Sequence, residues 1–246
     1  MTAILVCVIT LVLAGWLAHY FHAAVRAPRL DFDDSPFNGA LLARLDQLHR
    51  PYAPTPWLAN AHLQLLWLLL LDTVAPALRY DRTEVLRMRD GGTTALDWLG
   101  LDAAPATPTL VVLPSITGDA QGMRQPVARR IVVCTRRGHG GLELTAPVLN
   151  TMGCTQDLRE QLARIHDQVP DSPLYAVGVA AGSALLVRYL GEEGPRSLLR
   201  AGVAYCPGFD ISVAWHRVPP FYSRMMTRRT SAGARWPARG ARGSGP

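Results

Sequence analysis

A pattern of strand, tight turn and helix with two spaced glycines contains the residue types that could carry chemistry. Leu174–Glu193 reads LYAVGVAAGSALLVRYLGEE, an apolar run followed at once by residues at helical spacing. Gly178 and Gly182 flank Ala180, two positions away on each side. Such glycines allow a turn sharp enough to lift the central side chain above a sheet, where a serine would attack a carbonyl carbon. The lifted residue here is alanine, which has no nucleophile.

Ser183 is the nearest hydroxyl that could replace the missing one. Its own neighbours at minus two and plus two are Ala181 and Leu185, not glycines. It falls in the first turn of the predicted helix, where serine is a common N-cap. The N-cap role is therefore the preferred interpretation, and a substitute nucleophile is the alternative.

Three further loops follow predicted strands. In Pro114–Gly118, the N–H of Ile116 or Thr117 could face a developing oxyanion, although a plain turn explains the loop equally well. Arg136–Gly141 reads RRGHGG; its glycines and arginines could hold an anion, but the order is not that of a phosphate-binding loop. Its His139 is expected to be exposed or hydrogen-bonded. Asp210 and His216 follow the last predicted strand too closely to serve as separate acid and base of a triad.

These loops require an α/β sheet to position them. Short continuous apolar runs predict strands buried on both faces, as in a parallel sheet flanked by helices. The predicted strands are Thr109–Leu113, Ile131–Thr135, Leu174–Val179 and Ala201–Cys206, and the helices are Thr155–Gln168 and Ser183–Leu190. Arg89-Asp90-Gly91-Gly92 predicts a leading antiparallel hairpin between Thr83–Met88 and Thr93–Leu99.

The N-terminus predicts a membrane helix. Residues 3–25 are apolar over about the 20 residues that span a bilayer. A secretory signal peptide is the alternative, but no arginine precedes the apolar run. An uncleaved single-pass anchor is preferred, and its orientation stays open because Asp31 and its acidic neighbours follow Arg26 and Arg29 closely.

The segment between the anchor and the hairpin predicts two helices. Asn38–His49 has leucines at helical spacing and is expected to pack across the domain. Trp57–Val74 contains a leucine run too short to cross a membrane, so a buried or membrane-surface helix is expected. Within it, His62 and Gln64 are assigned hydrogen-bonding roles.

Composition excludes several classes of protein. The four cysteines are widely separated and show no zinc spacing, so neither a metal nor a disulfide framework is expected, and no cofactor is predicted. The net charge of +6 comes largely from arginines after residue 227, which read as a solvated tail. The chain contains no lysine, and no nucleic-acid partner is expected.

The order of several motifs resembles one family. AHLQ at 61–64, LPSITG at 113–118, RRGHGG at 136–141, GCTQDL at 153–158 and the turn ending in LGEEG resemble the YheT-like branch of the α/β-hydrolase-domain (ABHD) proteins. Members of that branch are membrane-anchored lipases and esterases, including monoacylglycerol lipases and phospholipases. The resemblance implies a mostly parallel sheet with flanking helices, Ala180 at the nucleophile position, and oxyanion N–H groups from Ile116 and Ala181.

The chain departs from the family pattern in ways that affect activity. Alanine replaces serine at 180, and the later strands carrying the acid and histidine are absent beyond about Met226. The expected organisation is an anchor at 1–27, a packing segment at 28–82, a partial hydrolase domain at 83–226 lacking its C-terminal part, and a basic disordered tail at 227–246.

Two functions follow from this pattern. The first is a membrane-anchored serine hydrolase acting on carboxylic esters of acylglycerols or phospholipids. The second is a truncated pseudohydrolase that binds a lipid or a partner without catalysis. The alanine at 180 favours the second, because loss of a triad member removes most of the rate enhancement.

Overall fold

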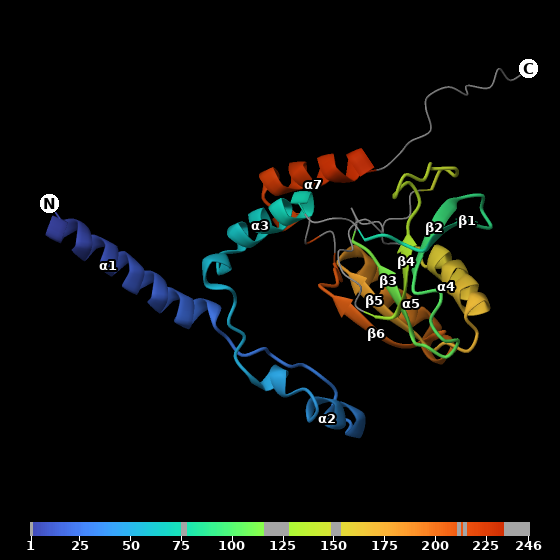
Figure 1. Ribbon diagram of the computed structural model, residues 1–246, viewed down its shortest axis with the longest axis horizontal. Coiled ribbons are helices and arrows are strands. Elements are labelled where there is room, and N and C mark those ends of the chain that lie inside the picture. The colour runs from blue at the N-terminus through green and yellow to red at the C-terminus, as the bar shows by residue number, and fades with distance from the viewer. Residues whose placement is uncertain are drawn as a thin grey trace, which may run out of the picture. The chain divides into compact units, whose positions relative to one another are not determined.

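The computed structural model describes residues 2–74, 78–115, 128–148, 154–210, 213 and 216–233 (Figure 1). The chain divides into two compact units, Met1–Ala75 and Pro76–Pro246. The expected oxyanion residues Ile116 and Thr117 lie outside the described residues.

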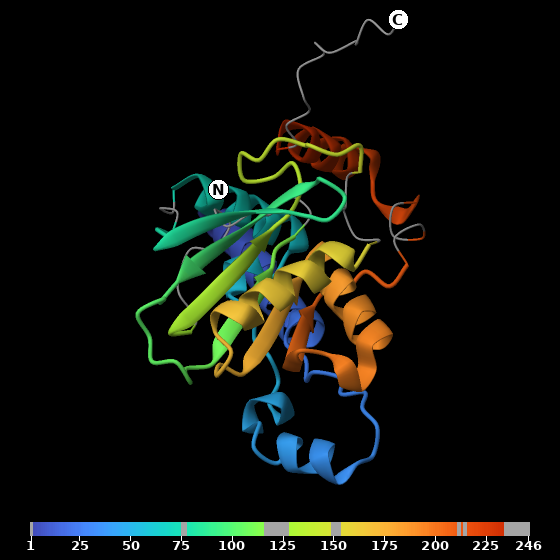
Figure 2. The ribbon, with the colours of Figure 1, turned by 90° about the vertical axis from the view of Figure 1, so that its right-hand side faces the viewer.

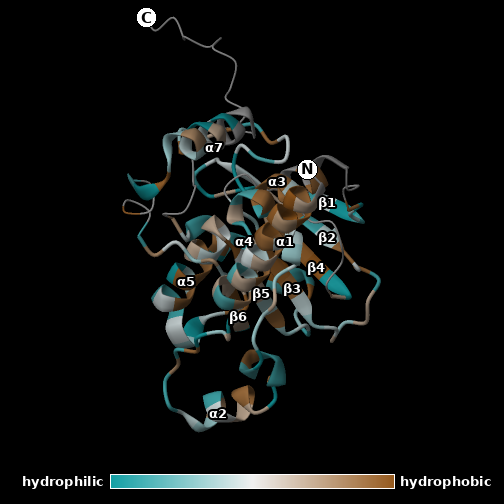
Figure 3. Cartoon of the chain, turned by 90° about the vertical axis from the view of Figure 1, so that its left-hand side faces the viewer, coloured by the Kyte–Doolittle hydropathy of each residue, from teal (hydrophilic) through white to brown (hydrophobic). Residues whose placement is uncertain are grey.

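The first unit begins with the predicted apolar helix. Helix α1 covers Thr2–His19 and continues as a turn of π-helix over Tyr20–Ala24. Ala3–Ala24 is long and apolar enough to cross a membrane, although a signal sequence would satisfy the same test. Figure 3 draws α1 largely in brown, the colour of hydrophobic residues, and its apolar side chains are exposed. The predicted N-terminal apolar helix is thus present.

The expected helix Asn38–His49 is wrong in extent. Helix α2 spans Pro36–Leu42, starting earlier because the Ser35 hydroxyl accepts a 3.2 Å hydrogen bond from the N–H of Asn38. A separate 3₁₀ turn, η2, covers Asp46–His49. Neither piece has a buried residue, so no packed face stabilises one continuous helix.

The expected helix Trp57–Val74 is also divided. A 3₁₀ turn, η3, covers Pro56–Leu58, and helix α3 covers Ala61–Val74. The Asn60 side chain accepts a hydrogen bond from the N–H of His62, and the Gln64 amide donates one to the carbonyl of Leu58. These bonds fix the start of α3. Its larger apolar side chains, Leu63, Leu66, Trp67, Leu68, Leu70 and Leu71, are exposed.

The second unit contains a six-stranded sheet in the order β1-β2-β4-β3-β5-β6. Its strands are β1 Arg82–Arg87, β2 Thr93–Leu99, β3 Thr109–Leu113, β4 Arg130–Thr135, β5 Leu174–Val179 and β6 Leu199–Tyr205. Strand β2 pairs antiparallel with β1 and β4, and β4, β3, β5 and β6 run parallel. The predicted mostly parallel α/β sheet with a leading hairpin is confirmed.

Two helices cover one face of this sheet. Helix α4 spans Gln156–Gln168 and helix α5 spans Ala181–Glu193, and Figure 2 shows them side by side in front of the strands. Both contribute to one hydrophobic core, which includes Trp98, Leu162 and Leu186. A second cluster, centred on Val112, Ile131 and Val133, lies on alternate positions of β3 and β4. Burial on both faces explains why these strands are continuously apolar.

The chain after β6 contains one further long helix. A 3₁₀ turn, η5, at Gly194–Arg196 precedes β6, and helix α7 covers Pro220–Gly233. Residues 227–233, which the sequence assigned to a disordered tail, are therefore helical. Residues 234–246 of that predicted tail lie outside the described residues.

Candidate active site

The turn between β5 and α5 has the backbone of a strained elbow. Ala180 has φ 49° and ψ −108°, a conformation that costs a residue with a Cβ on the order of 1–3 kcal/mol. Its N–H donates a 2.9 Å hydrogen bond to the carbonyl of Tyr205 at the end of β6. Its own carbonyl accepts bonds from the N–H groups of Ser183 and Ala184. The turn has not relaxed, although alanine occupies its tip.

The two flanking glycines are required by close packing. A Cβ at Gly178 would lie 2.5 Å from the Cα of Ser183, and one at Gly182 would lie 2.0 Å from the carbonyl oxygen of Leu113. Neither glycine has a positive φ. The two glycines allow α5 to pack against the ends of β3 and β5. The sequence pattern singled out these two positions, and the reason that they need glycine is steric contact.

Ser183 is buried and already bonded. Its side chain has no exposed surface, and its Oγ donates a 2.6 Å hydrogen bond to the carbonyl oxygen of Ala180. The predicted N-cap role is wrong, since Ala180 is the N-cap and the hydroxyl donates instead of accepting. The hydroxyl is held inside the turn and is not presented above the sheet.

One of the two oxyanion positions implied by the resemblance can be placed. Ala181 is the first residue of α5, and the first four N–H groups of a helix have no intrahelical acceptor. The loop that would supply the other donor is described only as far as Ser115. Immediately before it, the Pro114 carbonyl accepts a hydrogen bond from the buried Arg136 guanidinium. Burial lowers the pKa of Arg136 to about 10, so it remains cationic near neutral pH.

A small cavity lies beside this loop. Its volume is about 10 Å³, and its wall includes Pro114, Arg136 and Leu185. This space is close to that of one water molecule. Among the described residues it therefore offers no room for an acyl chain. Cys134 also faces it, and burial followed by the nearby Asp97 carboxylate raises the pKa of this thiol.

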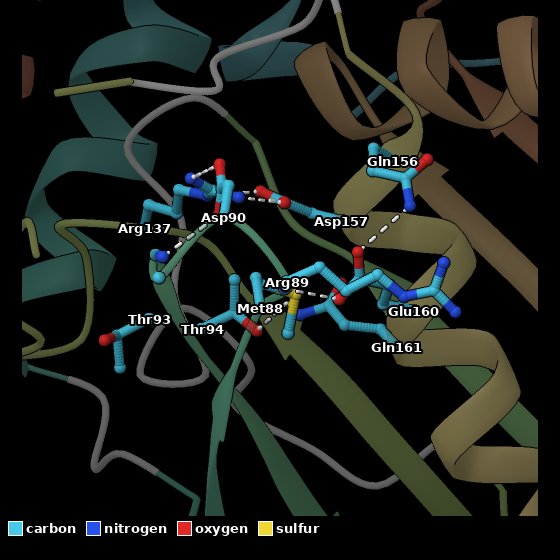
Figure 4. A network of polar contacts seen from close by, with 12 residues as sticks. Met88, Arg89, Asp90, Thr93, Thr94, Arg137, Gln156, Asp157, Glu160 and Gln161 are labelled. Atoms are coloured by element: carbon cyan, nitrogen blue, oxygen red, sulfur yellow. Dashed lines mark hydrogen bonds and ion pairs between the residues drawn. The ribbon is translucent and has the colours of Figure 1, made fainter. Parts of the chain in front are cut away.

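The RRGHGG loop is held by a buried ion-pair network (Figure 4). The Arg137 Nε and Nη2 donate hydrogen bonds of 2.8 and 2.5 Å to the two carboxylate oxygens of Asp157 on α4. Its Nη1 donates a 2.6 Å bond to Asp90 in the hairpin turn. The Asp157 and Asp90 carboxylates raise the pKa of Arg137. Because the Arg137 guanidinium is bonded to two carboxylates, a structural role for the loop is favoured over anion binding.

The structure also gives the positions of three polar residues that the sequence singled out, His139, Asp210 and His216. His139 is buried, and its Nδ1 lies 2.9 Å from the carbonyl oxygen of Arg137, so the hydrogen-bonded alternative for it is the correct one. The Asp210 carboxylate accepts a hydrogen bond from the N–H of Val213. His216 is exposed at a short helical turn. Within the described residues, no group of three histidine, cysteine, aspartate or glutamate residues could hold a metal ion.

Sequence reasoning missed two features of this region. The Asp90–Arg137–Asp157 network joins residues far apart in the sequence, and no local pattern pairs them. Cys206 has a positive φ of 54°, like Ala180, and follows β6 beside the elbow, because Val179 is paired with Tyr205. Glycine or asparagine in a turn signals a positive φ, but a cysteine does not.

Comparisons with known proteins agree with this geometry. No protein-family model matches the chain. It is 28% identical over 210 residues to Phospholipase ABHD3 of Bos taurus, covering 80% of this chain and 51% of that protein. It is 26% identical over 219 residues to Monoacylglycerol lipase ABHD2 of Danio rerio, covering 81% of this chain and 51% of the relative. The chain thus spans about half the length of these relatives.

A solved structure of brefeldin A esterase, a bacterial homologue of human hormone-sensitive lipase, has a TM-score of 0.45 and 17% identity, covering 89% of this chain and 61% of that one. The strand order and the glycine-flanked elbow define a core of the α/β-hydrolase type. The sequence matches show that the chain is similar to proteins of the α/β-hydrolase-domain (ABHD) family.

Proposed function

We propose that this chain is a membrane-anchored protein of the hydrolase fold that binds lipid esters without hydrolysing them. The observation that carries the proposal is the elbow itself. Ala180 keeps the strained backbone of a nucleophile position, at φ 49°, while its side chain is a methyl group. A conformation that costs free energy persists only where surrounding structure maintains it.

Loss of hydrolysis follows from the placement of hydroxyl groups. An acyl-enzyme requires an oxygen or sulfur nucleophile facing the ester carbonyl and a base to take its proton. The Ser183 hydroxyl is buried and donates a hydrogen bond to the Ala180 carbonyl oxygen. Without a nucleophile, oxyanion donors and binding contacts give only a small part of the usual acceleration.

A lipid ester is the ligand class supported by the relatives and by the apolar surface of the first unit. The matched relatives are named as a phospholipase and a monoacylglycerol lipase. The helix Ala3–Ala24 has the length and composition of a single membrane span. The exposed leucines of α3 also suit a helix lying at a membrane surface. We therefore assign acylglycerols or phospholipids as ligands and a membrane as the location.

The second candidate is an active carboxylic ester hydrolase, and the intact elbow favours it. It would need Ser183 to leave its bond with the Ala180 carbonyl and reach solvent. Since Ser183 lies behind the turn with no exposed surface, this movement would require the start of α5 to open.

The test is to measure ligand binding and ligand recovery in the same sample. The full chain in detergent is incubated with a labelled monoacylglycerol or phosphatidylcholine, and the bound lipid is extracted and analysed. We expect saturable binding with the ester recovered intact. Release of fatty acid above the buffer rate would contradict the proposal, as would the absence of saturable binding. The anchor is tested separately by alkaline carbonate extraction of membranes, which should leave the chain in the pellet.

A further inference from the structure

The N-terminal unit contains an open hollow at the end of its apolar helix. The hollow has a volume of about 670 Å³ and is formed by residues of two segments, 24–28 and 47–53. This volume lies within the range of small-ligand sites, roughly 300–1,000 Å³. It belongs entirely to the first unit and is separate from the elbow.

Two contacts hold the second segment against the end of the helix. The buried Tyr20 hydroxyl donates a 2.5 Å hydrogen bond to the carbonyl of Pro54. Arg26 and Tyr52 form an antiparallel bridge, with N–H···O distances of 3.2 and 2.8 Å. Tyr20 also stacks on Trp16, with ring centroids 5.8 Å apart. The chain after the helix thus folds back and builds the hollow at a fixed place, beside two aromatic rings.

The wall of the hollow combines two guanidinium groups with apolar surface. Arg26 and Arg50 are the charged residues on it, and both are exposed to solvent. Leu48 and Tyr52 contribute apolar area. The nearest acidic residue along the chain is Asp46, at the start of the η2 turn. Guanidinium groups suit phosphate because they donate two parallel hydrogen bonds in a planar fork.

The position of the hollow fits a lipid headgroup. At about 1.5 Å per residue, the helix Ala3–Ala24 is about 33 Å long, close to the thickness of the hydrocarbon core. Residues 24–28 then lie at the polar boundary of the bilayer. Tyrosine and tryptophan are enriched at that boundary. Trp16 and Tyr20 lie in the part of the helix that leads toward it.

We propose that this hollow binds the headgroup of an anionic phospholipid, with Arg26 and Arg50 on the phosphate and Leu48 and Tyr52 against the glycerol region. The proposal rests on the membrane-anchor part of the proposed function. It is independent of the chemistry at Ala180. Its ligand differs from the lipid ester of the proposed function, since the headgroup charge and not the ester is recognised.

The experiment titrates the full chain in detergent with phosphatidylglycerol or phosphatidylcholine of the same acyl chains and counts bound lipids by native mass spectrometry. We expect phosphatidylglycerol to bind more tightly by roughly thirtyfold, which corresponds to about fivefold per arginine at a membrane surface. The variant Arg26→Gln/Arg50→Gln should lose this preference. The matched variant Arg29→Gln/Arg44→Gln removes the same charge from exposed positions in the same unit and should keep it.

A second variant tests the hollow without changing charge. Leu48→Trp adds bulk to the wall of the hollow and should weaken the preference for phosphatidylglycerol while both arginines remain. Equal losses in the two arginine pairs would overturn the proposal, because they would indicate only general attraction to negative charge. Displacement of the lipid by inorganic phosphate alone would also overturn it.

The experiments distinguish an error in the proposed membrane anchor from an error in the proposed headgroup site. Release of the chain by carbonate would refute the anchor and remove the reason for a bilayer headgroup. Retention by carbonate together with no lipid preference in the wild-type chain would refute the hollow alone. Circular dichroism of each variant shows whether it is folded. The variants Arg26→Gln/Arg50→Gln and Leu48→Trp test the proposal independently, so one of them still decides it if the other does not fold.

Discussion

The Oγ of Ser183 lies 2.6 Å from the carbonyl oxygen of Ala180 and donates a hydrogen bond to it. The same carbonyl accepts bonds from the first N–H groups of α5, at Ser183 and Ala184. The Ser183 hydroxyl therefore helps to hold the strained residue in place. The turn keeps a strained backbone at Ala180, and the Ser183 hydroxyl is used for structure.

The strain at Ala180 predicts that glycine is more stable there. Ala180→Gly removes the Cβ at φ 49° and should raise the free energy of unfolding by about 1 kcal/mol. The matched control is Ala184→Gly within α5, where the backbone is helical and glycine should cost about 1 kcal/mol. Urea unfolding measures both. A loss of stability in Ala180→Gly would show that the turn is not strained at this residue.

Close packing at the elbow predicts opposite effects for two glycines of the same region. Gly182→Ala places a Cβ 2.0 Å from the Leu113 carbonyl oxygen and should destabilise by about 3 kcal/mol or prevent folding. Gly191→Ala, later in α5, meets nothing within 4 Å and should stabilise by up to about 1 kcal/mol. Thermal and urea unfolding distinguish the two. Similar effects from both substitutions would contradict the packing of α5 on β3.

Much of the second unit is predictable from sequence, because burial on both faces produces apolar runs that local pattern can detect. Strands Thr109–Leu113 and Leu174–Val179 have their predicted bounds. The helix predicted at Asn38–His49 failed, because leucine spacing alone does not stabilise a helix with no buried face. The roles of Ser183 and Arg137 could not be predicted either, since each depends on a partner brought close by the turn or the sheet.

The Arg137 network predicts a large cost for removing its guanidinium. Arg137→Met removes both hydrogen bonds that Arg137 donates to the largely buried Asp157 carboxylate, and breaking such a buried pair costs about 3–5 kcal/mol. The control is Arg164→Met, because Arg164 pairs with Glu84 at a more exposed position and such pairs contribute about 0–1 kcal/mol. Both are measured by urea unfolding. Equal small losses would show that Asp157 is solvated and that the network does not hold the RRGHGG loop.

Carboxylates with lowered pKa values predict how the free energy of unfolding changes at acidic pH. Hydrogen bonds from Thr155, then Arg188 and Arg159, lower the pKa of Glu192 to about 2, and the bond from Arg137 lowers that of Asp90. Their contribution is present above the unfolded pKa, near 4, and is lost as the pH falls toward the folded values. Unfolding free energy should therefore fall between about pH 5 and pH 2. Glu192→Gln should reduce this slope, and an unchanged slope would contradict the assignment.

We infer that the elbow has no working nucleophile. Labelling by a fluorophosphonate probe tests this inference, since the probe reacts with activated serine. The wild-type chain, Ser183→Ala and Ala180→Ser are compared at equal concentration. We predict no labelling of the wild-type chain or of Ser183→Ala. Labelling of the wild-type chain that disappears in Ser183→Ala would contradict the account, because it would make Ser183 the nucleophile.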